Sequence, residues 1–212
     1  MRTLIAIPCM DQVHVGFVRS LLTLEPAGQE ICYEISSGSL IYNSRNNLLE
    51  TAKNEKVDRI LWLDSDMTFS PDLLQRLSDD IDQGCDIVSG LYFGRRPPSN
   101  PIIFKDCELV QICDNQMLPL ATRYLDYPKD ALFEVAAFGF GCVLMKTEAA
   151  AKVVGEYGIM PFMPMGGFGE DLSFCMRARK AGIKLWCDSR IICGHIGYKE
   201  FTDKDFIGGV KK

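Results

Sequence analysis

The stretch "RILWLDSDMTFSPDLLQRL", residues 59 to 77, constrains the fold of this chain more than any other part of the sequence. Residues 59–63 are mostly apolar and are typical of a short buried strand. Ser70, Pro71 and Asp72 then form a strong helix start: a capping hydroxyl, a proline suited to the first turn, and an acid at the positive end of the helix dipole. A strand followed at once by a helix is the building unit of α/β layer structures.

The same alternation fills the first 93 residues. Strands are expected over 3–7, 29–36, 59–63 and 85–93, and helices over 11–24, 43–54 and 70–84, with Asp11 and Asn43 as caps. This order predicts an α/β fold with a mostly parallel central sheet flanked by helices. Right-handed crossovers bring the carboxyl ends of parallel strands to one edge, where open sheets bind ligands.

The second half is less regular. "GRRPPSNP", 94–101, predicts an irregular loop, which we expect to order over a bound ligand, and short strand-like pieces follow over 102–136. Helices are expected over 147–158, capped by Thr147, and over 170–182, and two short strands precede His195. We expect one domain over residues 1–198, with halves 1–93 and 94–198, followed by a C-terminal tail, 199–212.

The composition excludes several classes of protein. The chain is 47% hydrophobic and 24% charged, as ordinary globular proteins are. Its net charge of -5 argues against a nucleic-acid partner, which needs clustered cations. No apolar run reaches the roughly 20 residues of a membrane span, and the N-terminal one is too short for a signal peptide. We expect a cytoplasmic protein without a transmembrane segment, whose nine cysteines are reduced thiols packed as small hydrophobes.

Two carboxylates, Asp64 and Asp66, follow the strand at 59–63. Residues one apart on a strand point to the same side, so the two carboxylates repel unless a cation lies between them. Mg²⁺ and Mn²⁺ take hard oxygen ligands and join carboxylates to substrate phosphates. The alternative is an ordinary strand end, because Asp and Ser are common in turns.

A second acidic pair, Glu170 and Asp171, opens the helix at 170–182 after glycines at 166, 167 and 169. The glycines allow the backbone to approach a ligand closely, which indicates the wall of a pocket. An ionised carboxylate there is a candidate general base. The alternative is favourable charge at a helix N-terminus.

His195 and Arg45 are further candidates. His195 lies between glycines directly after a predicted strand, and with Asp64 and Asp66 upstream we interpret it as a metal ligand rather than a structural histidine. Arg45 opens the helix at 43–54 at the same predicted edge. Its guanidinium is suited to phosphate or a nucleobase, and the alternative is a solvated surface position.

Several stretches together resemble a glycosyltransferase of the GT-A fold, most like the non-processive members of family two. They are "IAIPCMD", "NSRNN", "LWLDSD", "FGFGCVLMKTEA", "GEDLSFCMRARKAG" and "GH", and the resemblance spans about residues 3 to 197. It implies an enzyme that moves a sugar from a nucleotide diphosphate donor to an acceptor hydroxyl. Residues 1–93 would be the nucleotide-binding half and 94–198 the acceptor-side half.

The resemblance also implies roles for single residues. Those it assigns to the donor are Pro8, Cys9, Arg45, Asp64, Ser65 and Asp66. Asp66 would bind Mn²⁺ or Mg²⁺ with His195 and Asp64 beside it, and Asp64 would meet the ribose or a metal-bound water. Asp171, with Glu170 as the neighbouring candidate, would deprotonate the acceptor, and inversion is the expected outcome.

Two departures and two alternatives bound this interpretation. Neither a QxxRW-like motif nor membrane helices are present, so chain polymerisation is not expected. "EISSG" lacks the acid that often contacts uracil, which leaves UDP- and GDP-linked donors open, as are glycan, lipid and protein acceptors. A sugar-phosphate nucleotidylyltransferase would need a Gly-rich basic loop where "PCMDQVHVG" stands. A non-catalytic nucleotide-sugar or glycan-binding protein is the second alternative.

Overall fold

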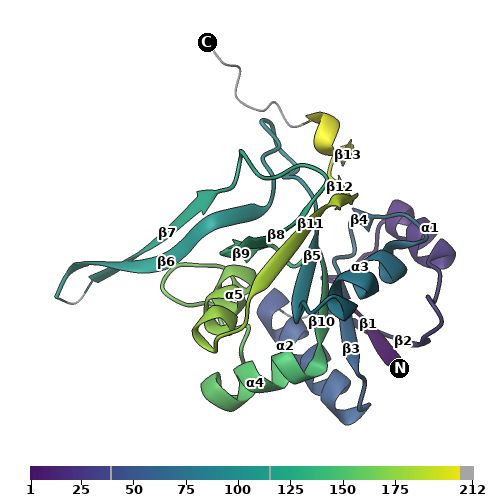
Figure 1. Cartoon of the computed structure of the whole chain (residues 1–212), viewed down its shortest axis with the longest axis horizontal. Coiled ribbons are helices and arrows are strands. Elements are labelled where there is room, and N and C mark those ends of the chain that lie inside the picture. Colours follow the sequence, from purple (N-terminus) through teal and green to yellow (C-terminus); the bar gives the residue numbers. More distant parts are fainter. Residues whose placement is uncertain (39, 115, 206–212) are drawn as a thin grey trace.

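The computed structural model describes residues 1–38, 40–114 and 116–205. Figure 1 shows a central twisted sheet with helices on both faces and a long hairpin that projects from one side. The sheet has seven strands in the order β2-β1-β3-β10-β5-β11-β8. Their bounds are β2 (Glu30–Ser36), β1 (Arg2–Pro8), β3 (Arg59–Leu63), β10 (Cys142–Lys146), β5 (Ile87–Leu91), β11 (Leu185–Ile192) and β8 (Leu132–Val135).

All strands of this sheet run in the same direction except β10 and β8. The predicted mixed α/β class with a mostly parallel central sheet is therefore confirmed. The antiparallel strand β10 lies between β3 and β5, a place that the alternation in the first half of the sequence does not reveal. The two short strands expected before His195 are instead the long strand β11 followed, after one residue, by β12 (Gly194–Ile196).

The apolar strand β3 explains how both faces of the sheet are covered. Ile60 and Trp62 point into one core layer, and Leu61 and Leu63 into the other. Strands buried on both faces read as continuous apolar runs, which is what residues 60–63 show. The first layer is covered by α2 (Ile41–Asn54), α4 (Thr147–Tyr157) and α5 (Glu170–Lys180), and the second by α1 (Val15–Thr23) and α3 (Leu73–Asp82).

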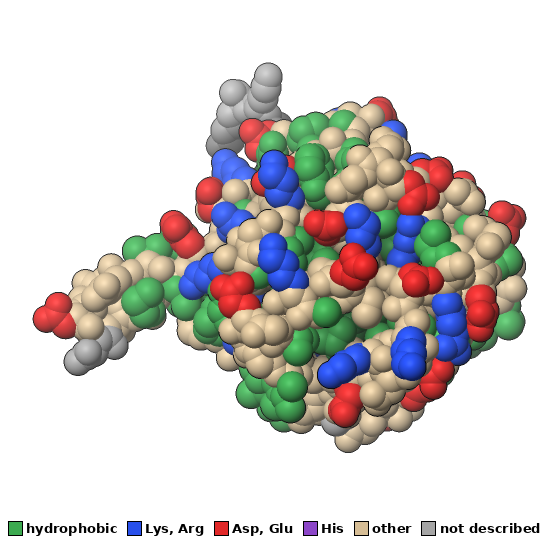
Figure 2. Space-filling view, turned by 60° about the horizontal axis from the view of Figure 1, so that its bottom comes forward, with side chains coloured by type: hydrophobic (Ala, Val, Ile, Leu, Met, Phe, Trp, Pro, Cys, Tyr) green, Lys and Arg blue, Asp and Glu red, His purple; other side chains and the backbone are tan. Residues whose placement is uncertain are grey.

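Two small sheets complete the structure. The projecting hairpin consists of β6 (Ile103–Cys113) and β7 (Gln116–Arg123), and β6 also pairs with β9 (Ala137–Phe138). Figure 2 shows hydrophobic side chains along this hairpin, and shows positive and negative side chains interspersed over the body on that face. The second small sheet joins β4 (Met67–Thr68), β12 and β13 (Glu200–Phe201), and η1 (Asp203–Asp205) follows. Thus β13 and η1 lie in the segment expected as a tail.

The helix boundaries correct four predicted caps. Helix α3 begins at Leu73, so its capping position is Asp72 and not Ser70. The cap of α1 is His14, whose Nδ1 accepts a hydrogen bond from the Gly16 amide, and not Asp11. Helix α2 starts before Asn43, because the amides of Asn43 and the next residue donate to the Leu40 carbonyl. Helix α4 begins at its expected cap, Thr147, so the capping position falls one residue earlier.

The cysteines behave as expected. All nine are free, and seven of them are buried. Burial raises the pKa of the Cys175 and Cys187 thiols well above the usual value, which keeps them protonated. These thiols are packing groups.

Candidate functional site

The candidate site lies where β3 ends. The Asp64 amide donates to the Gly141 carbonyl at 3.0 Å, and the Met67 amide donates back to the Asp64 carbonyl, which closes a turn directly after the strand. β4 then pairs with β12, so that His195 lies opposite Met67. The Asp66 carbonyl accepts from the Ile196 amide at 2.8 Å. Pairing of two short strands therefore brings together residues that lie about 130 positions apart in the chain.

The first part of the site is a carboxylate beside an imidazole. Asp66 Oδ2 lies 3.7 Å from His195 Nε2, so the structure brings these two predicted site residues together. His195 Nδ1 lies 2.8 Å from the Phe93 carbonyl oxygen, which only accepts, so Nδ1 carries the hydrogen. A neutral ring would then present the Nε2 lone pair to a carboxylate. Either a proton on Nε2 or a cation between the two groups satisfies this geometry.

Arg95, from the loop at 94–101, also contacts this pair. Its Nη1 donates to Asp66 Oδ2 at 2.7 Å. Burial acts to raise the pKa of Asp66, but the neighbouring His195 and Arg95 outweigh it and lower the pKa. Asp66 is therefore ionised at neutral pH.

Arg45 lies beneath the site. It is 2% exposed, so the solvated surface position considered above is wrong. Its Nη2 donates to Asp64 Oδ1 at 2.9 Å and its Nε donates to Glu170 Oε1 at 3.3 Å. Nη1 has no hydrogen-bond partner within the described ranges, and the guanidinium lies 5.4 Å from the Phe140 ring centroid. Arg45 thus joins the two acidic motifs from below, and no free face is turned to the surface.

Burial alone would lower the pKa of Arg45, but the carboxylates around it raise the pKa instead. Asp64 has a raised pKa, chiefly because it is desolvated, although Arg45 opposes this. A buried cation paired to two carboxylates is stable only while its partners remain. Asp64 is therefore committed to Arg45 in this structure, whereas Asp66 faces His195.

The second acidic motif sits at the start of α5. Glu170 is held by Arg45, but the Asp171 carboxylate has only a contact with the next amide, at 3.2 Å, among the residues described. Burial, then the charges of Glu170 and Asp64, raise the pKa of Asp171 to about 6 against the opposing effect of Arg45. A carboxylate with a pKa near the ambient pH is suited to proton transfer. Asp171 is accordingly the better candidate base of the two.

Tyr92 was not expected from the sequence. It follows β5, and its ring meets the His195 ring edge-on at 5.3 Å between centroids. Its hydroxyl oxygen accepts a hydrogen bond from the Gly141 amide at 3.2 Å. A Cβ at Gly139 would lie 2.0 Å from this oxygen, so the glycines of "FGFG" make room for Tyr92. The only sequence signal was an aromatic residue at the end of a predicted strand.

The remaining predicted donor residues line the neighbouring strand end. Pro8 ends β1, and the Cys9 amide donates to the Ser36 carbonyl at 2.9 Å. Cys9 Sγ donates to the Gln12 carbonyl at 3.0 Å, and Ser65 Oγ reaches the same oxygen at 3.5 Å. The loop after β1 therefore lies against the turn that carries Asp64 and Asp66.

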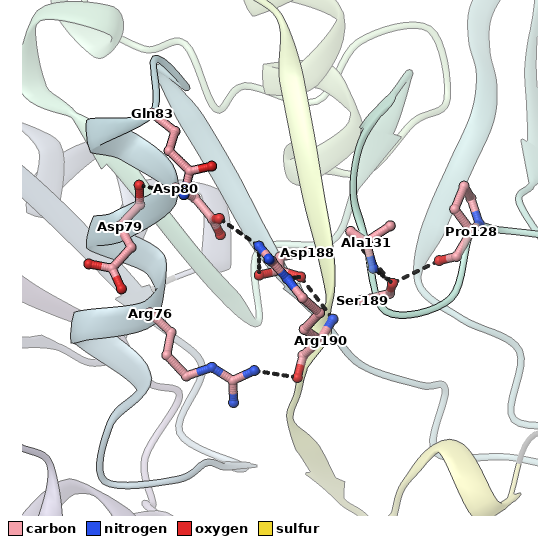
Figure 3. Close-up of polar contacts among 9 residues, drawn as sticks. All are labelled: Arg76, Asp79, Asp80, Gln83, Pro128, Ala131, Asp188, Ser189 and Arg190. Atoms are coloured by element: carbon pink, nitrogen blue, oxygen red, sulfur yellow. Dashed lines mark hydrogen bonds and ion pairs between the residues drawn. The ribbon is translucent and has the colours of Figure 1, made fainter.

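The strand that leads to β12 is anchored by a buried acidic pair (Figure 3). β11 has a bulge after Asp188, and Arg190 in this bulge donates to both oxygens of Asp188. It also donates to Asp80 of α3 at 3.1 Å, while Arg76 donates to the Arg190 carbonyl. Burial, then the Asp188 carboxylate, raise the pKa of Asp80 to about 7.

Comparisons with known proteins support the fold only. No family model and no curated protein matches the chain. The solved structure "A197 from STIV" superposes with a TM-score of 0.65 and 19% identity, over 93% of this chain and 86% of that one. At this identity the likeness shows a shared α/β fold.

The described ranges contain neither a membrane-spanning helix nor a complete metal-binding cluster. No helix there is long and apolar enough to cross a membrane. No group of three or more His, Cys, Asp or Glu side chains in those ranges is arranged to hold a metal ion by itself. Asp66 and His195 together supply two side chains that could bind a metal ion.

Proposed function

We propose that this chain is a metal-dependent glycosyltransferase with a GT-A fold, which transfers a sugar from a UDP- or GDP-linked donor to an acceptor hydroxyl. The observation that carries the proposal is that Arg45 bridges Asp64 and Glu170, so that an ionised Asp66 beside His195 and a half-buried Asp171 of raised pKa each lie next to one end of that bridge. Two chemical tasks need such a pair of centres. One stabilises the departing diphosphate and the other removes a proton.

The residues present fit Mn²⁺ or Mg²⁺ as part of a shell. Asp66 offers a carboxylate oxygen and His195 an imidazole nitrogen whose other ring nitrogen is already bonded. Two protein ligands leave room for diphosphate oxygens and water, as is usual when such cations bind nucleotides. Arg45 holds Asp64 Oδ1 and Arg95 holds Asp66 Oδ2, so the other oxygen of each carboxylate would be the one to bind a cation. When bound, the cation would supply Lewis-acid stabilisation of charge on the departing diphosphate.

The chain's own residues would accept the proton of the attacking hydroxyl and position the two acidic motifs. Asp171 accepts the proton of the attacking hydroxyl, because its raised pKa makes it a better base than an exposed carboxylate. Arg45 fixes Glu170 beside it and Asp64 below the donor side, which sets the distance between the two acidic motifs. A single displacement with this base across the sugar inverts the anomeric carbon.

The test is thermal stabilisation by UDP, GDP and their sugar conjugates, each with Mn²⁺ and with EDTA. At a ligand concentration 100 times Kd, binding adds about 2.7 kcal/mol, or a rise in Tm of about 5 to 10 °C for a chain of this size. We expect the rise only with Mn²⁺, its loss in Asp66→Ala, and its retention in the exposed control Asp106→Ala.

Two outcomes would refute parts of the proposal. If no nucleotide changes Tm under any metal condition, the donor site is absent and the proposal fails. If a nucleotide sugar binds with metal but is never hydrolysed or transferred, and Asp171→Asn binds it as the parent protein does, the chain is a binding protein without turnover.

A further inference from the structure

A pocket beside the candidate site is lined by cations. A surface hollow of about 350 Å³ is lined by Gly94, Arg95, Arg96, Pro98, Asn100, Ile102 and Arg123. Three of these side chains are guanidinium groups and none is acidic, although the whole chain has 28 acidic and 23 basic residues. A concentration of cations without acids in an acidic chain indicates a site for an anion.

The walls of this pocket are held in place. The Gly94 amide donates to the Asn100 carbonyl at 2.9 Å, which closes the loop at 94–101, and Phe93 pairs with Pro101. Ser99 is 1% exposed, and its amide donates to the Arg96 carbonyl. The loop is therefore a shaped wall in this structure.

Arg123 is the most constrained of the three arginines. Its Nη1 donates to the Pro101 carbonyl at 2.8 Å, and its guanidinium lies 4.6 Å from the Phe104 ring centroid. Partial burial lowers its pKa. Within the described part of the chain neither Arg123 nor Arg96 forms an ion pair, and only Arg95 has one, to Asp66. A half-buried cation without a counter-ion is costly, and an anionic ligand would relieve that cost.

The position of the pocket indicates which substrate it serves. At one end Arg95 reaches Asp66, the proposed donor side, and at the other the Ile102 amide donates to the carbonyl of Tyr92, whose ring meets His195. The donor diphosphate has its own place at Asp66 and His195. Guanidinium groups recognise phosphate oxygens through paired hydrogen bonds, and a cluster of them suits a doubly charged phosphate better than a carboxylate.

We propose that this arginine pocket binds a phosphate monoester carried by the acceptor, with Arg96 and Arg123 as its recognition residues. The acceptor role in this inference rests on the proposed function, but the anion site itself does not. A phosphate fills only part of the hollow, which leaves space for the first atoms of its substituent. A phosphorylated sugar and a phosphorylated lipid share this chemistry.

The test measures binding of phenyl phosphate, octyl phosphate and, separately, UDP or GDP with Mn²⁺ by calorimetry. Arg96→Gln removes an exposed side chain and so leaves folding unaffected, which a melting curve verifies. Arg123→Lys keeps the charge but removes the planar guanidinium group that can form paired hydrogen bonds. We expect each variant to weaken phosphate-monoester binding about tenfold or more, since charge-assisted hydrogen bonds are lost. Arg19→Gln, an exposed arginine on α1, is the charge-matched control and should change binding less than about twofold.

The outcomes separate this inference from the proposed function. Loss of phosphate-monoester binding with nucleotide binding intact supports an acceptor pocket, and stronger binding of octyl than of phenyl phosphate points to a lipid source. Equal loss of both ligands in Arg96→Gln would show that the pocket holds the donor diphosphate and would overturn the inference. If the monoesters bind but no nucleotide does, the anion site stands and its acceptor role is refuted with the proposed function. No binding of either monoester to the parent protein also overturns it.

Discussion

Replacement of Asp80 by asparagine should stabilise this protein at neutral pH. Asp80 is 1% exposed, and its Oδ2 has no hydrogen-bond partner in the described ranges. The groups that face it are Asp188 and Arg190 from β11, and Asp79 and Cys85 from its own side of the sheet. Its pKa is raised from 3.8 to about 7, so the folded protein keeps a proton that the unfolded chain releases. Stability should therefore fall as pH rises from about 4 to about 7, and level off above.

The magnitude follows from this shift. A rise of about 3 pKa units corresponds to about 4 kcal/mol, which is an upper bound because the Arg190 side chain is 44% exposed and the pair titrates together. We expect Asp80→Asn to be about 2 kcal/mol more stable than the parent protein at pH 8 and about equal to it at pH 4. Asparagine keeps the shape of the side chain and can donate to Asp188.

Urea unfolding at pH steps from 4 to 8 measures both proteins. An unchanged m-value would confirm that stability, and not the unfolded state, has changed. Asp106→Asn, an exposed carboxylate on β6 that is not among the groups facing Asp80, is the control and should leave the pH slope unaltered. If Asp80→Asn is instead less stable at pH 8, then the ionised carboxylate is needed to pair with Arg190, and the reasoning about a retained proton is wrong.

Three further predictions concern the candidate site. Arg45→Met should destabilise the protein by about 3 to 5 kcal/mol in urea unfolding, because Asp64 and Glu170 lose their buried cation; a loss below about 1 kcal/mol would show that they are solvated. Gly139→Ala should cost about 1 to 3 kcal/mol through a clash with the Tyr92 hydroxyl, and less in a Tyr92→Phe background; equal costs in the two backgrounds would place the strain elsewhere. Once turnover is established, kcat/KM should rise with pH through about 6 as Asp171 loses its proton, and a flat profile from pH 5 to 8 would exclude Asp171 as the base.

The sequence predicted the parts of the fold that local pattern determines. Residues 60–63 are a continuous apolar run, as is typical of a strand buried on both faces, and strand β3 matched its prediction at both ends. Gly158 and Gly182, both with positive φ, follow α4 and α5 as the sequence suggested. Strand β10 was not predicted, because an antiparallel insertion between two parallel strands depends on tertiary pairing and leaves no local signal.

The predictions of helix caps at Asp11 and Asn43 were wrong for a related reason. Asp11 and Asn43 are good capping residues, but α1 begins at Val15 and α2 at Ile41. Ile41 and Tyr42 begin α2 two residues early, and the cap position then falls on Leu40, which offers no side-chain acceptor. Capping contributes about 1 kcal/mol, and packing of the half-buried Tyr42 against the core is worth a similar amount, so a good capping residue alone does not decide the boundary.

In the candidate site, too, the sequence predicted which residues are involved but not which residues they contact. Asp64 and Asp66 were recognised as a pair, and a shared ligand was expected because adjacent carboxylates repel. In the structure Asp64 lies against Arg45, and Asp66 lies against His195 and Arg95. One carboxylate therefore stabilises the scaffold while the other faces the loop at 94–101. This division means that substitution of Asp64 should appear mainly as lost stability, whereas substitution of Asp66 should leave stability nearly intact and remove the response to metal.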